Sequence, residues 1–213
     1  MRSRRLAVVA VLLLCLAGGK ADLVAEILGK LQSRYEAIQD IQGEFTQTSL
    51  VASLGREDVS SGNVIVQRPG RMLWKYEEPE ARVVLLDRET VQIYTPGDGQ
   101  LQIVPIASGA ISPTALGFLL GGAVLRDAFR ASRITELGRE EIGLKLIPRE
   151  DAGFEYLELW LEPSSYQLRE SVVTDLFGNR TRVRFHGVRE NVGVGEEVFS
   201  ITVPEDTEVI DLR

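Results

Sequence analysis

The sequence contains only one cysteine, Cys15, and one histidine, His186, in 213 residues. Cys15 follows three leucines inside the N-terminal apolar run, whereas a lipid-attachment cysteine requires a small residue directly before it. We therefore expect no lipid anchor. Removal of this segment as a leader would leave no thiol, which excludes disulfides, thiolate metal sites and cysteine nucleophiles from the mature chain.

The sequence also lacks the motifs of common catalytic and nucleotide-binding sites. It contains no G-x-S-x-G turn for a serine nucleophile, no His or Cys spacing for zinc, and no glycine-rich phosphate-binding loop. His186 shares the polar face of a predicted strand with Arg180, Arg182 and Arg184, which is typical of a surface histidine. The acidic pairs Glu140–Glu141 and Glu196–Glu197 lie beside glycines, as residues of exposed turns do. We expect no enzyme, no cofactor and no metal, with a carboxylate-based lipid hydrolase as the most distant alternative.

Long hydrophobic runs are absent except at the N-terminus. There, three arginines precede an apolar run at residues 6–16, and small residues suitable for cleavage follow at residues 19–21. This pattern predicts a secretory signal peptide over residues 1–21 and a periplasmic mature protein. No later run reaches the roughly 18 apolar residues that a membrane helix needs. We therefore expect the mature protein to be soluble, with one domain over residues 22–213.

Basic residues are fewer than acidic ones, 24 against 31, which gives a net charge of −7. The leader contains four basic residues and no acidic one, so the mature chain has 20 basic and 31 acidic residues and a net charge of −11. A chain this acidic is not expected to bind nucleic acid. Its 192 residues, 213 less 21, suit a single β-domain.

The mature chain begins with a helical pattern, because apolar residues recur every three or four positions between Asp22 and Ile38. Short segments separated by turn residues then predict strands. We expect these strands at residues 42–49, 59–68, 71–76, 81–86, 90–94, 101–105, 132–139, 143–148, 154–161, 168–174, 180–186 and 198–203.

A helical insertion interrupts the predicted strands. Ser112 and Pro113 form a helix start, an apolar stretch follows, and Gly121 and Gly122 end it. A second short helix is expected over residues 124–131. Roughly a dozen strands with one helical insertion predict a barrel or a strongly curved sheet.

Two predicted strands are apolar on both faces. In residues 154–161 one face has Phe154, Tyr156 and Trp160, and the other has three leucines; residues 81–86 behave similarly. Such strands are covered by helices on one face and line an apolar interior on the other, or else they are the central strands of a filled sandwich. Periodicity does not separate these two interpretations. Residues 180–186, in contrast, have one solvated face with alternating arginines.

Several short stretches between positions 43 and 100 follow one another in an unusual order. They are Gly43-Glu44-Phe45-Thr46-Gln47, Arg68-Pro69-Gly70, Trp74-Lys75-Tyr76, Glu78-Pro79 and Tyr94-Thr95-Pro96. An F-x-Q strand followed by R-P-G-x-x-x-W and a Y-x-P hairpin resembles the outer-membrane lipoprotein carrier family, LolA. Fainter similarity continues to Val209, so the resemblance covers most of the mature chain.

The resemblance implies a mainly β fold with a few helices. The expected architecture is an unclosed antiparallel β-barrel, or half-barrel, covered by an N-terminal helix and a short helical lid. Its apolar cavity would hold the acyl chains of lipoproteins during transfer from the inner to the outer membrane. The implied partners are lipoproteins, an inner-membrane lipoprotein-releasing transporter and an outer-membrane lipoprotein acceptor. The protein is expected to be a monomer without a cofactor.

The resemblance also implies site residues. Arg68 would hold the lid closed through hydrogen bonds to lid backbone carbonyls, and its alternative role is that of an ordinary turn arginine. Candidates for the acyl-chain cavity and its mouth are large or flexible apolar side chains, which adapt to irregular acyl groups. They are Met72, Trp74, Leu116, Phe118, Leu119 and Leu120, each of which could equally belong to a plain core.

Three other functions fit the same fold. A lipid-anchored acceptor at the outer membrane would begin at a lipidated cysteine after a small residue, which Leu14-Cys15 does not provide. A periplasmic carrier of free lipids or glycolipids would need the same apolar cavity, and the sequence does not distinguish its ligands from lipoproteins. An envelope-stress lipoprotein sensor with this fold would carry an additional domain, for which 192 residues leave no room.

Overall fold

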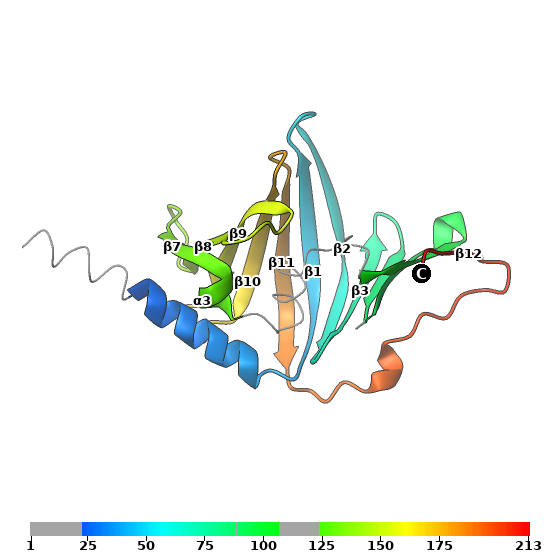
Figure 1. The fold of residues 1–213 in the computed structure, drawn as a ribbon, viewed down its shortest axis with the longest axis horizontal. Helices are drawn as coiled ribbons and strands as arrows, with labels where there is room; N and C mark the ends of the chain where they lie inside the picture. Colours follow the sequence, from blue (N-terminus) through cyan, green and yellow to red (C-terminus); the bar gives the residue numbers. More distant parts are fainter. Residues whose placement is uncertain (1–22, 88, 107–123) are drawn as a thin grey trace, which may run out of the picture.

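A single sheet dominates the computed structural model, which describes residues 23–87, 89–106 and 124–213. Its twelve described strands lie in the order β12-β6-β5-β4-β3-β2-β1-β11-β10-β9-β8-β7 (Figure 1). In chain order they are β1 Asp40–Val51, β2 Arg56–Gln67, β3 Arg71–Glu78, β4 Arg82–Leu86, β5 Thr90–Thr95, β6 Gln100–Pro105, β7 Phe129–Ile134, β8 Ile142–Pro148, β9 Phe154–Leu161, β10 Leu168–Asp175, β11 Arg180–Glu190 and β12 Glu208–Asp211.

The sheet is not closed, because β7 and β12 at its two ends do not pair with each other. Every described pairing is antiparallel except that of β12 with β6, which is parallel. The predicted mainly β, unclosed architecture is therefore confirmed. The sheet divides into a first half, β1 to β6 with β12, and a second half, β7 to β11, joined along the β1–β11 pair.

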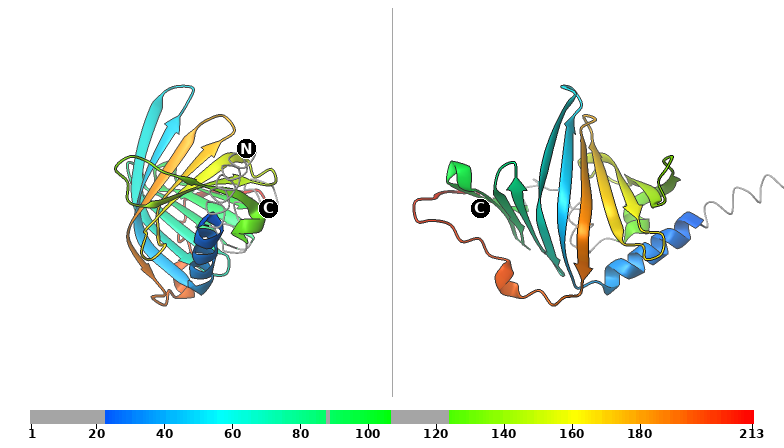
Figure 2. Two further views of the ribbon diagram at one scale, coloured as in Figure 1. Left: turned by 90° about the vertical axis from the view of Figure 1, so that its left-hand side faces the viewer. Right: turned by 180° about the vertical axis from the view of Figure 1, so that it is seen from behind.

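A helix over residues 23–37 confirms the predicted N-terminal helix. It lies against one face of the curved sheet, which we call the inner face (Figure 2). Ile27, Leu28 and Leu31 are buried there against leucines of β8 and β9. Within the described residues, no helix is long and apolar enough to cross a membrane.

Two predicted segments differ from the structure near β7. The short helix α3 spans only Leu125–Ala128, and β7 already begins at Phe129, so the predicted helix over residues 124–131 and strand over 132–139 were wrong in their bounds. Pairing explains the early start, because Phe129 lies opposite Pro148 in β8 and its side chain is fully buried. The strand ends at Ile134, before a turn in which the Arg139 amide donates to the Glu136 carbonyl.

The predicted strand over residues 198–203 was also wrong. A 3₁₀ turn, Glu196–Val198, and an irregular segment occupy this region, and the last strand is β12. The segment from β11 to β12 runs along the first half of the sheet to its far edge (Figure 1). The Arg71 guanidinium lies over the Phe199 ring there, 6.0 Å from the ring centre. Phe199 therefore packs against a side chain of the sheet without belonging to a strand.

The leader predicted over residues 1–21 lies outside the described residues and stays a prediction, as does the domain boundary at residue 22. The helix expected from Ser112 to Leu120 lies outside them as well.

An aromatic cluster forms on the inner face of the first half of the sheet. The ring of Phe45 lies 4.5 Å from that of Trp74 and 5.1 Å from that of Tyr76. Gly62 of β2 lies opposite both Phe45 and Tyr76, and a β-carbon at this position would overlap the carbonyl oxygen of Lys75. Only glycine lets the strands approach this closely while the rings cover the gap.

Asp40 at the start of β1 fixes the chain that leaves β11. Its buried carboxylate accepts hydrogen bonds from the amides of Val192, at 2.7 Å, Gly193, at 3.0 Å, and Val194, at 3.4 Å. We expect Asp40→Ala to lower the free energy of unfolding by about 2 kcal/mol, because three amides, that of the buried Val194 among them, lose a charged acceptor. Urea unfolding measures the change.

The matched control is Asp58→Ala, which removes a carboxylate from a strand with an exposed Arg56 partner. It should change the free energy of unfolding by less than about 0.5 kcal/mol. Equal losses in the two variants would contradict an anchoring role for Asp40.

Candidate functional site

A cavity of about 210 Å³ lies between the N-terminal helix and the inner face of the sheet. Its walls come from the helix, from β1 to β3, and from β10 and β11, so it spans the junction of the two half-sheets. Most of the lining side chains are apolar: Leu31, Tyr35, Ile38, Ile41, Val64, Val66, Met72, Trp74, Leu168, Val173, Val183, Phe185 and Val188.

The structure brings three of the predicted site residues together along one wall. Met72 and Trp74 of β3 and Arg68 of the β2–β3 turn all line the cavity. Met72 is nearly fully buried, and Trp74 is partly buried at the edge of the aromatic cluster. Leu116, Phe118, Leu119 and Leu120 lie outside the described residues.

Arg68 connects the β2–β3 turn to the end of the N-terminal helix. Its guanidinium donates a hydrogen bond to the backbone carbonyl of Tyr35 and lies over the Tyr35 ring, 4.2 Å from the ring centre. Burial raises the pKa of the Tyr35 hydroxyl, and the positive charge of Arg68 offsets only part of this shift. The Nε atom of Arg68 is buried and has no hydrogen-bond partner among the described residues.

Three polar side chains that the sequence did not predict as site residues line the cavity together. Arg34 of the helix donates from Nη2 to both carboxylate oxygens of Glu190, at 2.6 and 2.5 Å, and Gln167 donates to Glu190 at 3.2 Å. All three side chains line the cavity. Arg34 and Glu190 are 156 positions apart, so no local pattern in the sequence pairs them. Their contact fastens the helix to β11.

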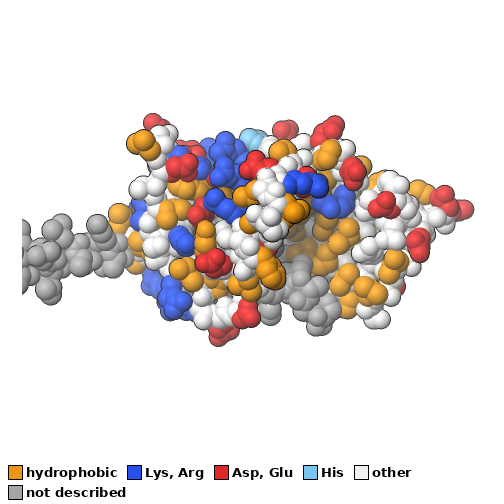
Figure 3. Space-filling view, turned by 90° about the horizontal axis from the view of Figure 1, so that it is seen from above, with side chains coloured by type: hydrophobic (Ala, Val, Ile, Leu, Met, Phe, Trp, Pro, Cys, Tyr) orange, Lys and Arg blue, Asp and Glu red, His pale blue; other side chains and the backbone are white. Residues whose placement is uncertain are grey.

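The first half of the sheet has a second apolar region on its inner face. Its cluster contains residues of β1 to β5 and β11 but none of the N-terminal helix. From above, apolar side chains gather around a hollow between more strongly charged regions (Figure 3). This cluster shares Val64, Met72 and Val183 with the wall of the cavity, so the cavity borders the aromatic cluster of the first half.

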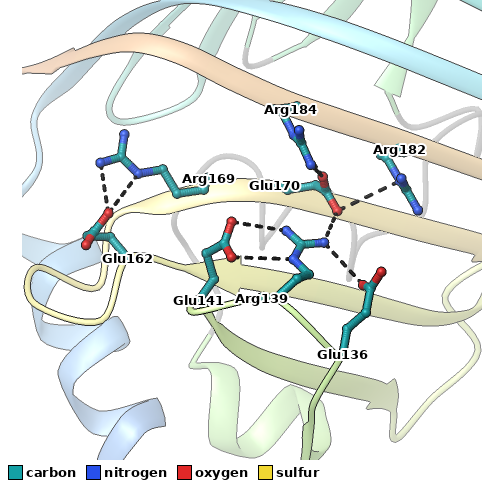
Figure 4. Close-up of polar contacts among 8 residues, drawn as sticks. All are labelled: Glu136, Arg139, Glu141, Glu162, Arg169, Glu170, Arg182 and Arg184. Atoms are coloured by element: carbon teal, nitrogen blue, oxygen red, sulfur yellow. Dashed lines mark hydrogen bonds and ion pairs between the residues drawn. The ribbon is translucent and has the colours of Figure 1, made fainter.

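The outer face of the second half has a buried ion cluster instead. Glu170 of β10 has no exposed surface and accepts from Arg139 at 2.9 Å and from Arg184 at 2.7 and 3.1 Å, with Arg182 3.8 Å away (Figure 4). Arg139 also lies over the Trp160 ring, 3.9 Å from its centre. Arg182 and Arg184 of β11 are exposed, as predicted, while their guanidiniums lie against the buried carboxylate.

Burial raises the pKa of the Glu170 carboxyl, but hydrogen bonds from Arg139 and Arg184 lower it by more, and the net shift is downward. Glu170 therefore stays ionised in the folded protein at neutral pH. This cluster lies on the opposite face of the sheet from the cavity. The hydrogen bonds of Glu170 to Arg139 and Arg184 connect the loop around Arg139 to β10 and β11.

The described residues contain no group of three or more His, Cys, Asp or Glu side chains that could hold a metal ion. His186 is exposed, and its Nε2 atom lies 3.3 Å from the hydroxyl of Thr46. The distinctive feature of the described structure is an apolar cavity under a helix.

Sequence comparison finds a family match over residues 36–202, to the family described as outer membrane lipoprotein carrier protein LolA. The outer-membrane lipoprotein carrier protein of Methylobacillus flagellatus is 28% identical over 204 residues, which cover 89% of this chain and 96% of that protein. The protein of the same name from Nitrosomonas europaea is 27% identical over 207 residues, covering 97% and 98%.

Solved structures resemble this fold at low sequence identity. An uncharacterized conserved protein from Thermus thermophilus has a TM-score of 0.54 at 16% identity, covering 88% of this chain and 98% of that one. A putative outer membrane lipoprotein-sorting protein domain from Vibrio parahaemolyticus has a TM-score of 0.51 at 14% identity, covering 84% and 97%. These similarities support the fold.

Proposed function

The chain belongs to the outer membrane lipoprotein carrier family, and from this premise we propose that it is a periplasmic carrier of lipoproteins. In this proposal the cavity binds the acyl chains of the cargo, and the protein transfers the cargo from the inner to the outer membrane. The observation that carries the proposal is the apolar cavity between the N-terminal helix and the sheet, with Met72 and Trp74 in its wall.

The need for such a cavity follows from the cost of exposing acyl chains to water. Each exposed methylene costs about 0.8 kcal/mol, so a chain of about 16 carbons represents on the order of 12 kcal/mol. The cavity volume of about 210 Å³ is below the roughly 300–1,000 Å³ of typical ligand pockets. We therefore expect the cover to move when cargo enters, with Leu116, Phe118, Leu119 and Leu120 at the mouth.

In the proposed mechanism, Arg68 stabilises the closed form. Its contact with the Tyr35 carbonyl holds the end of the helix, and its buried Nε atom leaves a donor for a lid carbonyl. Cargo shifts the equilibrium only by binding the open form more tightly than the closed form. A few hydrogen bonds from one arginine stabilise the closed form by only a few kcal/mol, which the free energy of cargo binding exceeds.

We expect Arg68→Leu to leave the protein folded but to destabilise its closed form, so that cargo is released less readily. Lipoprotein transfer should slow about tenfold, because one charged hydrogen bond is worth roughly 1.5–3 kcal/mol. The measurement is transfer of a labelled lipoprotein from the loaded carrier to acceptor membranes. Arg71→Leu is the control, since Arg71 begins β3 directly after the same turn and its partner Glu196 is largely exposed. Transfer at the wild-type rate would refute the role of Arg68.

The function itself is tested by native purification from the periplasm and mass spectrometry of the bound material. We expect acylated lipoproteins in a one-to-one complex with a monomeric carrier whose N-terminus is Asp22. Free lipids or glycolipids as the only bound species would instead support a lipid carrier. A regulatory partner without any acylated cargo would support an envelope-stress sensor.

The proposed exchange partners are an inner-membrane lipoprotein-releasing transporter and an outer-membrane lipoprotein acceptor. Crosslinking in intact cells, followed by identification of the linked membrane proteins, examines both. Neither step needs a cofactor or a chemical reaction of the carrier, because loading and release change only non-covalent contacts.

A further inference from the structure

A second hollow opens at the β7 end of the sheet and shares no described lining residue with the cavity. It has a volume of about 820 Å³ and lies between the start of the N-terminal helix, α3 and β7, which are neighbours in Figures 1 and 2. Its apolar walls consist of Leu23, Val24, Ala25, Leu28, Phe129 and Ala131. Leu23 is 46% exposed although it is a leucine on a helix, so this apolar surface is accessible.

Three exposed arginines, Arg126, Arg133 and Arg149, line the same hollow, and none of its described lining residues is acidic. None of the three has a carboxylate within ion-pair distance in the described chain. Arg126 makes only a 3.5 Å contact with the Ala25 carbonyl. The arginines of the Glu170 cluster, in contrast, all have acidic partners. The positive charge here is available to a ligand.

Strand β7 adds polar backbone to this basic and apolar surface. It is the last described strand at its end of the sheet, so its outer edge has no strand partner in the described part of the chain. Such an edge presents unpaired amide and carbonyl groups. Arg133, which lines the hollow, belongs to this edge strand.

We propose that this hollow binds one molecule of an anionic phospholipid. Its acyl chains lie along the accessible apolar residues Leu23, Val24 and Ala131, and its phosphate is held by the guanidiniums, which bind phosphate in a forked geometry. A purely apolar ligand would make no use of the three guanidiniums that line the hollow. The site is independent of the cavity, so the proposal does not rest on lipoprotein transport.

The test is calorimetric titration of the protein, purified from the periplasm, with dihexanoyl phosphatidylglycerol below its micelle concentration. Dihexanoyl phosphatidylcholine and inorganic phosphate are the comparison ligands. We expect the anionic lipid to bind at least about tenfold more tightly than either, because only it combines an uncompensated phosphate with acyl chains. Added salt should weaken its binding, since the arginines are exposed.

Matched variants locate the site. Arg133→Gln should weaken binding of the anionic lipid about tenfold. Arg130→Gln should change it less than twofold, because Arg130 is an exposed arginine on the same strand that does not line the hollow. Binding should persist in Ser171→Trp, a substitution in the wall of the cavity.

Equal affinity for the two lipids would overturn the proposal, as would equal losses in Arg133→Gln and Arg130→Gln. Phosphate binding as tight as that of the anionic lipid would identify a free-phosphate site and overturn the lipid assignment. Loss of lipid binding in Ser171→Trp would move the ligand into the cavity. Failure of lipoprotein loading with intact phospholipid binding would count only against the proposed function.

Discussion

Ser171→Trp is expected to abolish loading of lipoproteins, with binding of acyl chains reduced at least about 100-fold. Ser171 lies on the inner face of β10, opposite Leu159 and Val183, and lines the cavity. An indole at this position occupies the space that acyl chains would take, and a loss of only four buried methylenes costs about 3 kcal/mol. Binding of a fluorescent fatty acid and loading with purified lipoprotein measure the effect.

The control for this substitution is Ser164→Trp, which adds the same side chain at an exposed position of the β9–β10 turn. Overpacking at residue 171 should lower the free energy of unfolding by roughly 1–3 kcal/mol, so circular dichroism and urea unfolding are needed to establish that the variant is folded. Normal loading by folded Ser171→Trp would exclude the cavity as the acyl-chain site.

Glu170→Ala is expected to lower the free energy of unfolding by about 3 kcal/mol. It removes a buried carboxylate and leaves Arg139, whose side chain is 13% exposed, without its innermost partner. Arg182 and Arg184 are about half exposed, so water can solvate their charges once Glu170 is removed. The expected loss therefore lies at the lower end of the range for buried ion pairs. Urea unfolding at neutral pH measures this loss.

Glu162→Ala is the matched control, because Glu162 forms a more exposed pair with Arg169 on the same half of the sheet. It should cost less than about 1 kcal/mol. A similar cost for both substitutions would contradict a special role for the buried cluster.

The same carboxylate makes stability depend on pH. The pKa of Glu170 is lowered in the folded protein, so its contribution is present above the ordinary value of 4.5 and is lost as the pH falls through the folded-state pKa. The stability difference between wild type and Glu170→Gln should therefore shrink in acid. A constant difference from neutral pH down to pH 3 would contradict the lowered pKa.

Most of the strands could be predicted from the sequence because alternation and turn residues are local signals. The stretch from Arg68 to Trp74 was also informative, since these residues share one turn and strand and meet at one wall of the cavity. The strand over residues 198–203 was mispredicted because apolar residues of an irregular segment packed on the sheet resemble a strand. The short strand β12 was missed because its four residues have little pattern of their own.

Contacts between distant residues explain what the sequence analysis missed in the site. The pairing of Arg34 with Glu190 depends on the helix reaching β11, and local spacing has no information about that geometry. The burial of Glu170 depends on three arginines from a loop and a neighbouring strand, whereas a lone glutamate among alternating residues is typical of a solvated face. Tertiary packing decided both cases.

The strand order has a consequence for how the chain folds. Apart from the β12–β6 pair, neighbouring strands within each half-sheet are also neighbours in sequence, so most of each half can form by closing short loops. The β1–β11 pair joins residues such as Phe45 and Phe185 that lie 140 positions apart, and this long loop is slow to close. We infer that two preformed sheets meet late at this seam. The cavity spans the same seam, so it is complete only once the two half-sheets have paired.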